Sequence, residues 1–214
     1  MTTAATCATC GSSFTPPAEL LERFPGWTPP ECPDCFGRGR RRSASAPAAR
    51  RVEHDERSLL DEVLARHKGG PDTGVFTDGG ASPNPGPGGW AAVYVVDGVI
   101  VAQASGHEPQ TTNNRMELTA ILEGIQLVPE GTRATIYSDS NLAVRTVNEW
   151  APGWRARGWR RKSGPVENLD LVRPLCERLD DRPELDLAWI QAHAGNRWNE
   201  YADALATAYQ RETL

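Results

Sequence analysis

From residue 73 onward, the hydrophobic positions alternate between the two-residue period of strands and the longer period of helices. Strand-like apolar runs occur at 75–78, 90–96, 99–105, 133–138 and 184–190. Helical spacing marks 113–128, 141–149, 168–179 and 197–210. The second and third strands meet at Asp97-Gly98, a dipeptide typical of a tight hairpin. Three antiparallel strands followed by β–α units predict an α/β domain, with a mixed sheet flanked by helices.

The first 72 residues follow a different pattern. Residues 1–37 hold the paired cysteines, and residue 38 begins a Ser/Ala/Pro/Arg stretch typical of a linker. That stretch leads into a short amphipathic helix, in which Val52, Leu59, Leu60, Val63 and Leu64 fall near helical spacing before Gly69-Gly70-Pro71 ends the run. We therefore divide the chain into a small module (1–37), a basic linker with a short helix (38–72) and the α/β domain (73–214).

The composition is that of a folded, water-soluble chain. Of the 214 residues, 39% are hydrophobic and 24% are charged. The longest apolar runs, such as 90–96, are too short to span a bilayer. The first ten residues lack a basic stretch followed by an apolar core, so we expect no secretory signal, no membrane association and a cytoplasmic location.

Charge is distributed unevenly along the chain. Residues 1–72 carry ten Lys/Arg and ten Asp/Glu, so the net charge of -5 arises entirely from residues 73–214. Bulk charge therefore does not indicate nucleic-acid binding. Two segments are basic and free of acid, with six arginines in residues 38–51 and five Lys/Arg in residues 155–162. Such runs are usually solvated faces, so each needs structural context.

Four of the five cysteines form two Cys-x-x-Cys pairs, Cys7–Cys10 and Cys32–Cys35, with twenty-one residues between the pairs. This pattern is close to that of a zinc ribbon, because each pair can present two thiolates to one tetrahedral ion. A structural Zn²⁺ would also explain how a short segment with little apolar content folds. Redox pairs or unbound thiols are the alternative. We expect the fifth cysteine, Cys176, to be a small buried residue on a helix.

Four acidic residues occupy positions from which they could converge. Asp78 and Asp139 stand at the ends of predicted strands, and Glu117 and Asp203 lie early in predicted helices. Carboxylates brought together in this way repel one another unless a divalent cation neutralises them, and oxygen-only ligands favour Mg²⁺ or Mn²⁺ over zinc. Taken singly, each acid would be a helix cap or a solvated surface group.

Five sequence blocks carry a resemblance to a known family. They are TDGGASPNPGPGGWA (77–91), TTNNRMELTAIL (111–122), YSDSNLAVRTVNEW (137–150), GWRARGWRRKSGPVENLDL (153–171) and WIQAHAGNRWNEYADALA (189–206). In this order they closely resemble type 1 ribonuclease H enzymes of the bacterial kind, over essentially all of residues 73–214. The resemblance implies a five-stranded mixed sheet flanked by helices, and an endonuclease that cuts the RNA strand of RNA–DNA hybrids.

The resemblance also implies a set of catalytic residues. The family's metal-binding carboxylates fall on Asp78, Glu117, Asp139 and Asp203. Phosphodiester hydrolysis needs an activated water and relief of charge on the leaving oxygen, which two Mg²⁺ ions can supply, leaving 5′-phosphate and 3′-hydroxyl ends. His193 falls where the family has a mobile histidine that assists proton transfer or product release, a role suited to a group that titrates near neutral pH. An isolated histidine in such a loop would be a surface residue.

Residues that read the hybrid are implied in the same way. Asn113 and Asn114 contact nucleic acid in the family, although helix capping is a common role for asparagine. The family's pocket for a DNA-strand phosphate falls on Asn84, Thr112 and Asn168. Its basic protrusion, which grips the DNA backbone, falls on residues 150–162, where we single out Trp150, Trp154, Arg157, Trp159 and Arg160. We expect at least one of these tryptophans to pack in the core.

The N-terminal module departs from the family, whose hybrid-binding domain lacks such cysteines. Its partner is therefore open, a protein or further nucleic acid, and we expect the chain itself to be a monomer. Two alternatives to a hybrid-cutting enzyme stay open at this stage. A DNA-cutting transposase or resolvase of the same superfamily would lack the TTNNRMEL block and the Trp/Arg protrusion. A non-catalytic regulatory protein acting through the zinc module would be expected to have lost a carboxylate, and none is missing.

Overall fold

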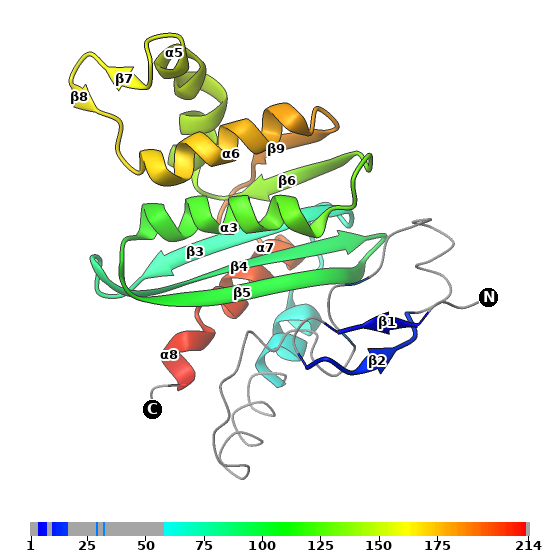
Figure 1. Cartoon of the computed structure of the whole chain (residues 1–214). Helices are drawn as coiled ribbons and strands as arrows, with labels where there is room; N and C mark the ends of the chain where they lie inside the picture. Colours follow the sequence, from blue (N-terminus) through cyan, green and yellow to red (C-terminus); the bar gives the residue numbers. More distant parts are fainter. Residues whose placement is uncertain (1–3, 8–9, 17–28, 30–31, 33–57, 213–214) are drawn as a thin grey trace.

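A five-stranded mixed sheet forms the centre of the molecule (Figure 1). The computed structural model describes residues 4–7, 10–16, 29, 32 and 58–212. The strands are β3 (Gly74–Ala81), β4 (Gly86–Val96), β5 (Val99–Thr111), β6 (Ala134–Ser138) and β9 (Leu185–Trp189), in the order β5-β4-β3-β6-β9. The first three are antiparallel, and β6 and β9 continue the sheet in parallel with β3. The predicted mixed sheet of five strands flanked by helices is confirmed.

Helices cover both faces of this sheet. From residue 113 onward, the helices are α3 (Asn113–Leu127), α4 (Asn141–Arg145), the π-helical turn η1 (Thr146–Trp150), α5 (Ala151–Arg155), α6 (Leu169–Asp181), α7 (Arg197–Ala206) and α8 (Ala208–Glu212). Figure 1 shows α3 in front of the sheet and α7 behind it.

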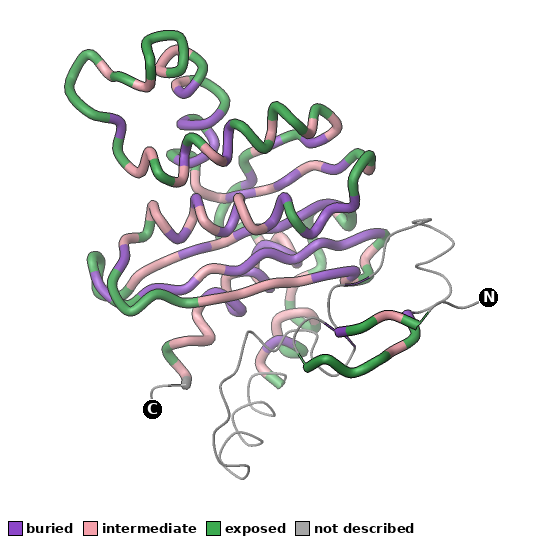
Figure 2. Tube along the Cα trace, in the orientation of Figure 1, coloured by how far each residue is buried: buried purple, intermediate pink, exposed green. Residues whose placement is uncertain are grey.

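Each face has its own core, because alternate residues of a strand point to opposite sides. Val75 of β3 packs in the larger cluster with Leu118 and Ile121 of α3, whereas Phe76 packs in the second cluster with Trp198 and other residues of α7. In Figure 2 the buried colour runs along the central strands and the helix faces that meet them. β3, buried on both faces, therefore forms a rigid base for side chains at its end.

Besides β3, β4 and β5, which are longer than the predicted strands, the elements differ from the prediction in three places. The predicted helix 141–149 continues to Arg155 through η1, where the N–H of Ala151 donates to the carbonyl of Thr146, five residues back. A π turn inserts an extra residue and shifts the apolar spacing, so the 3.6-residue period no longer marks the helix. The predicted helix 197–210 is divided at Thr207, whose hydroxyl donates to the Asp203 carbonyl.

The third difference lies after α5, in a segment that the sequence marks only as irregular. It forms a two-residue hairpin of β7 (Arg160–Arg161) and β8 (Gly164–Pro165). Pro174, which the sequence marks as a possible kink, lies inside α6 without ending it. None of the helices in the described part of the chain has both the length and the apolar composition needed to cross a bilayer.

The predicted amphipathic helix is present in residues 58–66, the described part of its range. Leu60 is buried in the second core cluster, and Leu59, Val63 and Leu64 pack against that cluster. Its apolar face therefore joins the same core as α7 and the back of β3.

Candidate active site

Strand register brings the first two acids together. β3 and β6 are parallel neighbours in which Thr77 pairs with Ser138, so the next residues along each strand are Asp78 and Asp139. Adjacent strands lie about 4.8 Å apart, which leaves the two carboxylates side by side. The sequence predicts that Asp78 ends its strand, but β3 continues to Ala81 by pairing with β4. Asp78 lies instead where the parallel pairing with β6 ends.

Gly79 allows a helix to bring the third acid to this point. A Cβ at Gly79 would lie 2.3 Å from the carbonyl carbon of Met116 and 2.6 Å from the nitrogen of Glu117. Only a glycine lets the backbone of α3 pass this close to the strand. As a result, one carboxylate oxygen from each of Asp78, Glu117 and Asp139 lies within 4.8 Å of the other two.

The fourth acid, Asp203, comes from α7 on the other side. It lies close enough to Asp78 to form a hydrogen bond with it and to shift its titration. Asn199, one turn earlier on α7 and buried, donates from Nδ2 to Oδ2 of Asp139 at 3.1 Å. The indole Nε1 of Trp189 donates to the backbone carbonyl of Asp139 at 3.0 Å. Asp139 is thus held by groups from two elements other than its own.

Asp78, Glu117 and Asp203 lie in an environment that disfavours negative charge. Burial, followed by repulsion from Asp139 and Asp203, raises the pKa of Asp78 well above its usual range. Burial and repulsion from its neighbours raise the pKa of Glu117 to about 9. Burial also raises the pKa of Asp203, although nearby His193 opposes that rise. A bound cation would remove this penalty, because it stabilises the ionised carboxylates.

The donor set fits a hard divalent cation. All the clustered ligands are carboxylate oxygens, which Mg²⁺ and Mn²⁺ prefer. Oε2 of Glu117 is buried and has no hydrogen-bond partner among the described residues. A buried carboxylate oxygen without a donor is costly, and a metal ion is one partner that would satisfy it.

His193 lies in the loop between β9 and α7, at the edge of this cluster. Its side chain is 77% exposed, and its Nδ1 lies 3.8 Å from Oε2 of Glu200. One ligand atom from each of His193, Glu200 and Asp203 lies within 4.8 Å of the other two. The histidine therefore adjoins the carboxylates through Asp203 while its ring stays open to solvent.

Comparison with known proteins assigns this arrangement to a family. The family model for RNase H matches residues 71–211, which include all four acids and His193. The chain belongs to the ribonuclease H family. Curated relatives include the ribonuclease H of Methylorubrum extorquens, 46% identical over 140 residues, and that of Granulibacter bethesdensis, 44% identical over 139 residues. The first alignment spans 65% of this chain and 60% of the relative, and the second spans 64% and 91%.

Solved structures agree with the family assignment. LC9-RNase H1, described as a type 1 RNase H with the type 2 active-site motif, is 32% identical, with a TM-score of 0.54 over 67% of this chain and 76% of its own. The RNase H domain of PFV, at 20% identity and a TM-score of 0.55, covers 68% of this chain and 96% of its own and shares the fold. The ribonuclease H match excludes the N-terminal module and most of the linker.

Two of the residues expected to hold a DNA phosphate, Asn84 and Thr112, accept backbone hydrogen bonds at the start of α3. Oδ1 of Asn84 accepts from the N–H of Asn113 at 3.2 Å, and Oδ1 of Asn113 accepts from the N–H of Ala81 at 2.7 Å. Thr112 is the N-cap of α3, so capping falls to this threonine rather than to Asn113 or Asn114. Oδ1 of Asn114 is buried without a partner among the described residues.

Arg115 connects this group to α6. Its Nη1 donates to Oδ1 of Asn168 at 3.4 Å, and its guanidinium forms a two-point ion pair with Asp170, with contacts of 3.0 and 2.7 Å. Asn168 adopts a left-handed backbone conformation at the start of α6. The structure therefore brings Asn84, Thr112 and Asn168 into one connected region, which also includes Arg115.

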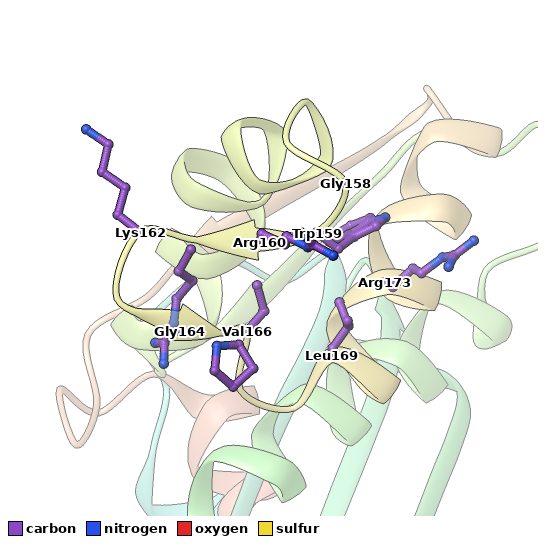
Figure 3. Close-up of a pocket in the computed structure, with 10 residues that line it drawn as sticks. Gly158, Trp159, Arg160, Lys162, Gly164, Val166, Leu169 and Arg173 are labelled. Carbon is purple, nitrogen blue, oxygen red and sulfur yellow. The ribbon is translucent and has the colours of Figure 1, made fainter.

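The expected basic protrusion forms a separate lobe that α5 and the β7–β8 hairpin build. A hollow of about 640 Å³ opens between this hairpin and the start of α6, and the side chains that line it include Trp159, Arg160, Lys162 and Arg173 (Figure 3). Among the described residues, no ion pair involves Arg157, Arg160 or Lys162. These three exposed cations are therefore available to an anionic ligand.

The tryptophans of the protrusion have different surroundings. Trp154 and Trp159 pack against the larger core cluster, as expected for at least one of them. Trp150 is half-buried, with its ring 6.2 Å from that of Trp154 and the guanidinium of Arg145 5.0 Å from its centroid. The protrusion is thus fixed to the core by aromatic side chains, while its cations extend into solvent.

Three of the four paired cysteines fall within the described residues and lie together. One sulfur from each of Cys7, Cys10 and Cys32 lies within 4.8 Å of the other two, and Sγ of Cys10 is 3.7 Å from Sγ of Cys32. Cys7 follows β1 (Ala5–Thr6), which pairs with β2 (Ser13–Phe14) in a short hairpin. Cys35 lies outside the described residues.

Two functional candidates were missed by the sequence reasoning. Asn199 and Arg115 both lie within the quoted motif blocks, but nothing in the spacing assigns them a partner. Asn199 could have been found as a polar residue on the buried face of α7, one turn before Asp203. Arg115 could not, because its partners in α6 are more than fifty positions away.

Proposed function

We propose that this protein is an endonuclease that hydrolyses the RNA strand of RNA–DNA hybrids, leaving 5′-phosphate and 3′-hydroxyl ends. The observation that carries the proposal is the convergence of Asp78, Glu117, Asp139 and Asp203 in a chain of the ribonuclease H family. A non-catalytic binding role would not require four acids to be held together at such an electrostatic cost.

The four carboxylates are proposed to hold two Mg²⁺ ions, with Mn²⁺ as a substitute. When bound, the ions would supply an activated water and stabilise the leaving 3′-oxygen. The protein's own part is orientation: Asn199 donates to Asp139, and Gly79 lets α3 bring Glu117 against Asp78. Preformed ligand geometry of this kind lowers the reorganisation that binding requires.

His193 is proposed to move protons or to assist product release. Its Nδ1 faces Glu200, which leaves Nε2 to exchange a proton with the substrate or with water. A neutral imidazole accepts a proton and an imidazolium donates one near neutral pH. Since the ring is largely exposed, its contribution should be smaller than that of the carboxylates.

Recognition of the hybrid is proposed to use two surfaces. The region around Asn84, Thr112, Asn113, Asn114 and Asn168 offers amides, a hydroxyl and the Arg115 guanidinium to the backbone of the nucleic acid. The protrusion, with Trp150, Trp154, Arg157, Trp159 and Arg160, offers cations to DNA phosphates. Neither surface reads base edges, so we expect no sequence preference.

The N-terminal module is proposed to bind one structural Zn²⁺ through Cys7, Cys10, Cys32 and Cys35. Three sulfurs already lie within the separation that ligands of one ion require. The described part of the module offers little else to stabilise it, since its core cluster consists of Cys7 and Cys32 with Phe14 beside them.

A cleavage assay tests the proposed activity. End-labelled RNA–DNA hybrid, duplex DNA and duplex RNA of one sequence would be incubated with the protein, with Mg²⁺ or with EDTA. We expect internal cuts in the RNA strand of the hybrid with Mg²⁺ alone, and intact duplex DNA and RNA. Cleavage of duplex DNA would instead favour a DNA-cutting member of the superfamily, and no cleavage at all would favour a binding protein.

A further inference from the structure

A short segment before the ribonuclease H match lies against the loop that carries His193. We call this segment, residues 67–70, the strap. The N–H of Gly69 donates to the carbonyl of Gly195 at 3.2 Å, and the carbonyl of Gly69 accepts from the N–H of Arg197 at 2.8 Å. Gly69 therefore pairs with Asn196 as a parallel bridge, outside the sheet. The family match begins at residue 71, so the strap is an addition to that match.

The strap is anchored to the core at its other end. It follows directly on the helix of residues 58–66, whose buried Leu60 packs in the same cluster as Trp198. The N–H of His67 donates to the carbonyl of Val63 at 3.0 Å, and Nζ of Lys68 donates to the carbonyl of Leu64 at 2.8 Å. These bonds close the end of the helix and fix where the strap begins.

The strap holds two features of the proposed site at once. The Arg197 N–H is one of the donors at the start of α7 that have no partner within the helix. The cap residue Asn196 provides no side-chain hydrogen bond to this helix end. The carbonyl of Gly69 takes that role from outside the helix, which carries Asn199 and Asp203. The N–H of Gly69 fixes Gly195, which lies two residues after His193. The φ of His193, 49°, lies in the sparsely populated left-handed region.

We propose that Gly69 and Gly70 are positioning residues that set the His193 loop for the reaction. The inference rests on the proposed function, since it assigns the strap an effect on turnover through His193. Close approach explains why both positions are glycine. A Cβ at Gly70, where φ is +87°, would lie 2.7 Å from Oδ1 and 3.3 Å from Cα of Asn196, and one at Gly69 would lie 3.1 Å from the Gly195 oxygen.

The test is Gly70→Ala in the full chain, with Gly131→Ala as the matched control. Gly131 has a comparable φ of +74° in the turn after α3, but a Cβ there has nothing within 4 Å. Both substitutions thus carry similar backbone strain, and only the first displaces Asn196. We expect kcat on the hybrid to fall roughly three- to tenfold in Gly70→Ala, with KM changed less than about twofold, and both constants unchanged in the control.

A second cycle separates positioning from general destabilisation. In a His193→Ala background, Gly70→Ala should cause little further loss of kcat, because the group it positions is gone. A full additional loss would contradict the proposal, and so would equal activity of Gly70→Ala and Gly131→Ala. If Gly70→Ala lowers the unfolding midpoint far more than Gly131→Ala, the milder Gly69→Ala replaces it in the same cycle. Little further loss of kcat in the His193→Ala background would then support the proposal, and a full additional loss would contradict it. Absence of hybrid cleavage by the unmutated protein would refute the proposed function, which is a different result.

Discussion

The carboxyl group of Glu117 lies against Asp78 and Asp139 with one oxygen buried and unpaired among the described residues. Its raised pKa, about 9, follows from burial and from those two neighbours. Ionising this group without a cation is therefore unfavourable in the folded state and easy in the unfolded chain, where a glutamate titrates near 4.3. The site thus couples protonation, metal binding and stability.

This coupling predicts how stability depends on pH in metal-free protein. The pKa of Glu117 is higher in the folded state than in the unfolded state. The protonated Glu117 therefore contributes fully to the free energy of unfolding below about pH 4, and this contribution is lost as pH rises toward 9. We expect Glu117→Gln to be more stable than the unmutated protein in EDTA at pH 8, by on the order of 2 kcal/mol, with the difference shrinking toward pH 5. Urea unfolding of both proteins across this range measures it. Mg²⁺ should stabilise the unmutated protein more than the variant, and parallel pH curves would contradict the account.

The roles of Asp78 and His193 predict unequal losses of activity. Asp78 lies at the centre of the cluster, whereas His193 is exposed at its edge. Asp78→Asn should therefore abolish hybrid cleavage, and His193→Ala should slow turnover by roughly 10²-fold, as expected for loss of a general acid or base. Single-turnover rates of both variants under saturating Mg²⁺ make the comparison, and equal losses would refute this division of roles.

At this scale the sequence identifies the acids but not how they meet. The motif blocks point to Asp78, Glu117, Asp139 and Asp203, yet their convergence depends on the Thr77–Ser138 register and on the close approach of α3 at Gly79. Both are tertiary relations between segments tens of residues apart. Arg115 escaped prediction for the same reason, since its partner Asp170 lies far along the chain.

Among the elements, the basic protrusion presents cations on a lobe that aromatic packing holds in place. The half-buried Trp154 and Trp159 secure it, and Arg157, Arg160 and Lys162 extend from it. This separation predicts that the cations change hybrid affinity without changing the fold. Each one that contacts a phosphate adds a counterion to those released on binding.

Removing these cations should therefore change the salt dependence of binding. In Arg157→Ala, Arg160→Ala and Lys162→Ala, we expect weaker hybrid binding and a plot of log K against log salt whose slope is shallower by about one unit per lost phosphate contact. Arg133→Ala is the control, an exposed arginine in the loop before β6. Hybrid affinity would be measured by fluorescence anisotropy, with each substitution made in the Asp78→Asn background so that the hybrid is not cleaved. Unchanged slopes in all three variants would exclude the protrusion from the interface.

The order of the elements was largely predictable, because strand and helix periods are clear from residue 73 onward. The errors fall where a local geometry breaks the period. The π turn at 146–150 shifts the apolar spacing, so the helical pattern in the sequence ends before the helix does. The β7–β8 hairpin has only two residues in each strand, too few for alternation to be visible.

At the scale of the whole molecule, the chain combines the ribonuclease H domain with an N-terminal extension of two parts. The helix at 58–66 shares the core of the domain and leads into the strap, although composition groups it with the linker. The sequence cannot show this, because an amphipathic helix does not specify which surface covers its apolar face. The cysteine cluster is the second part.

The cysteine cluster predicts a metal content that can be counted. The protein purified without chelator should contain about one zinc ion per chain, and Cys32→Ser should lose it. Cys176→Ser is the control, since burial raises the pKa of Cys176 to about 11 and keeps this thiol protonated inside α6. Elemental analysis of the three proteins gives the answer. Zinc retained in Cys32→Ser, or absent from the unmutated protein, would contradict the assignment.

The most direct test of the account is the rate of RNA-strand cleavage in a hybrid as Mg²⁺ is titrated from zero to saturation, for the unmutated protein and for Asp78→Asn. The carboxylate cluster predicts no cleavage without metal, a saturable rise as Mg²⁺ is added, and no activity in Asp78→Asn at any concentration. Cleavage in EDTA, or a variant that keeps the activity of the unmutated protein, would show that the reaction takes place without this cluster.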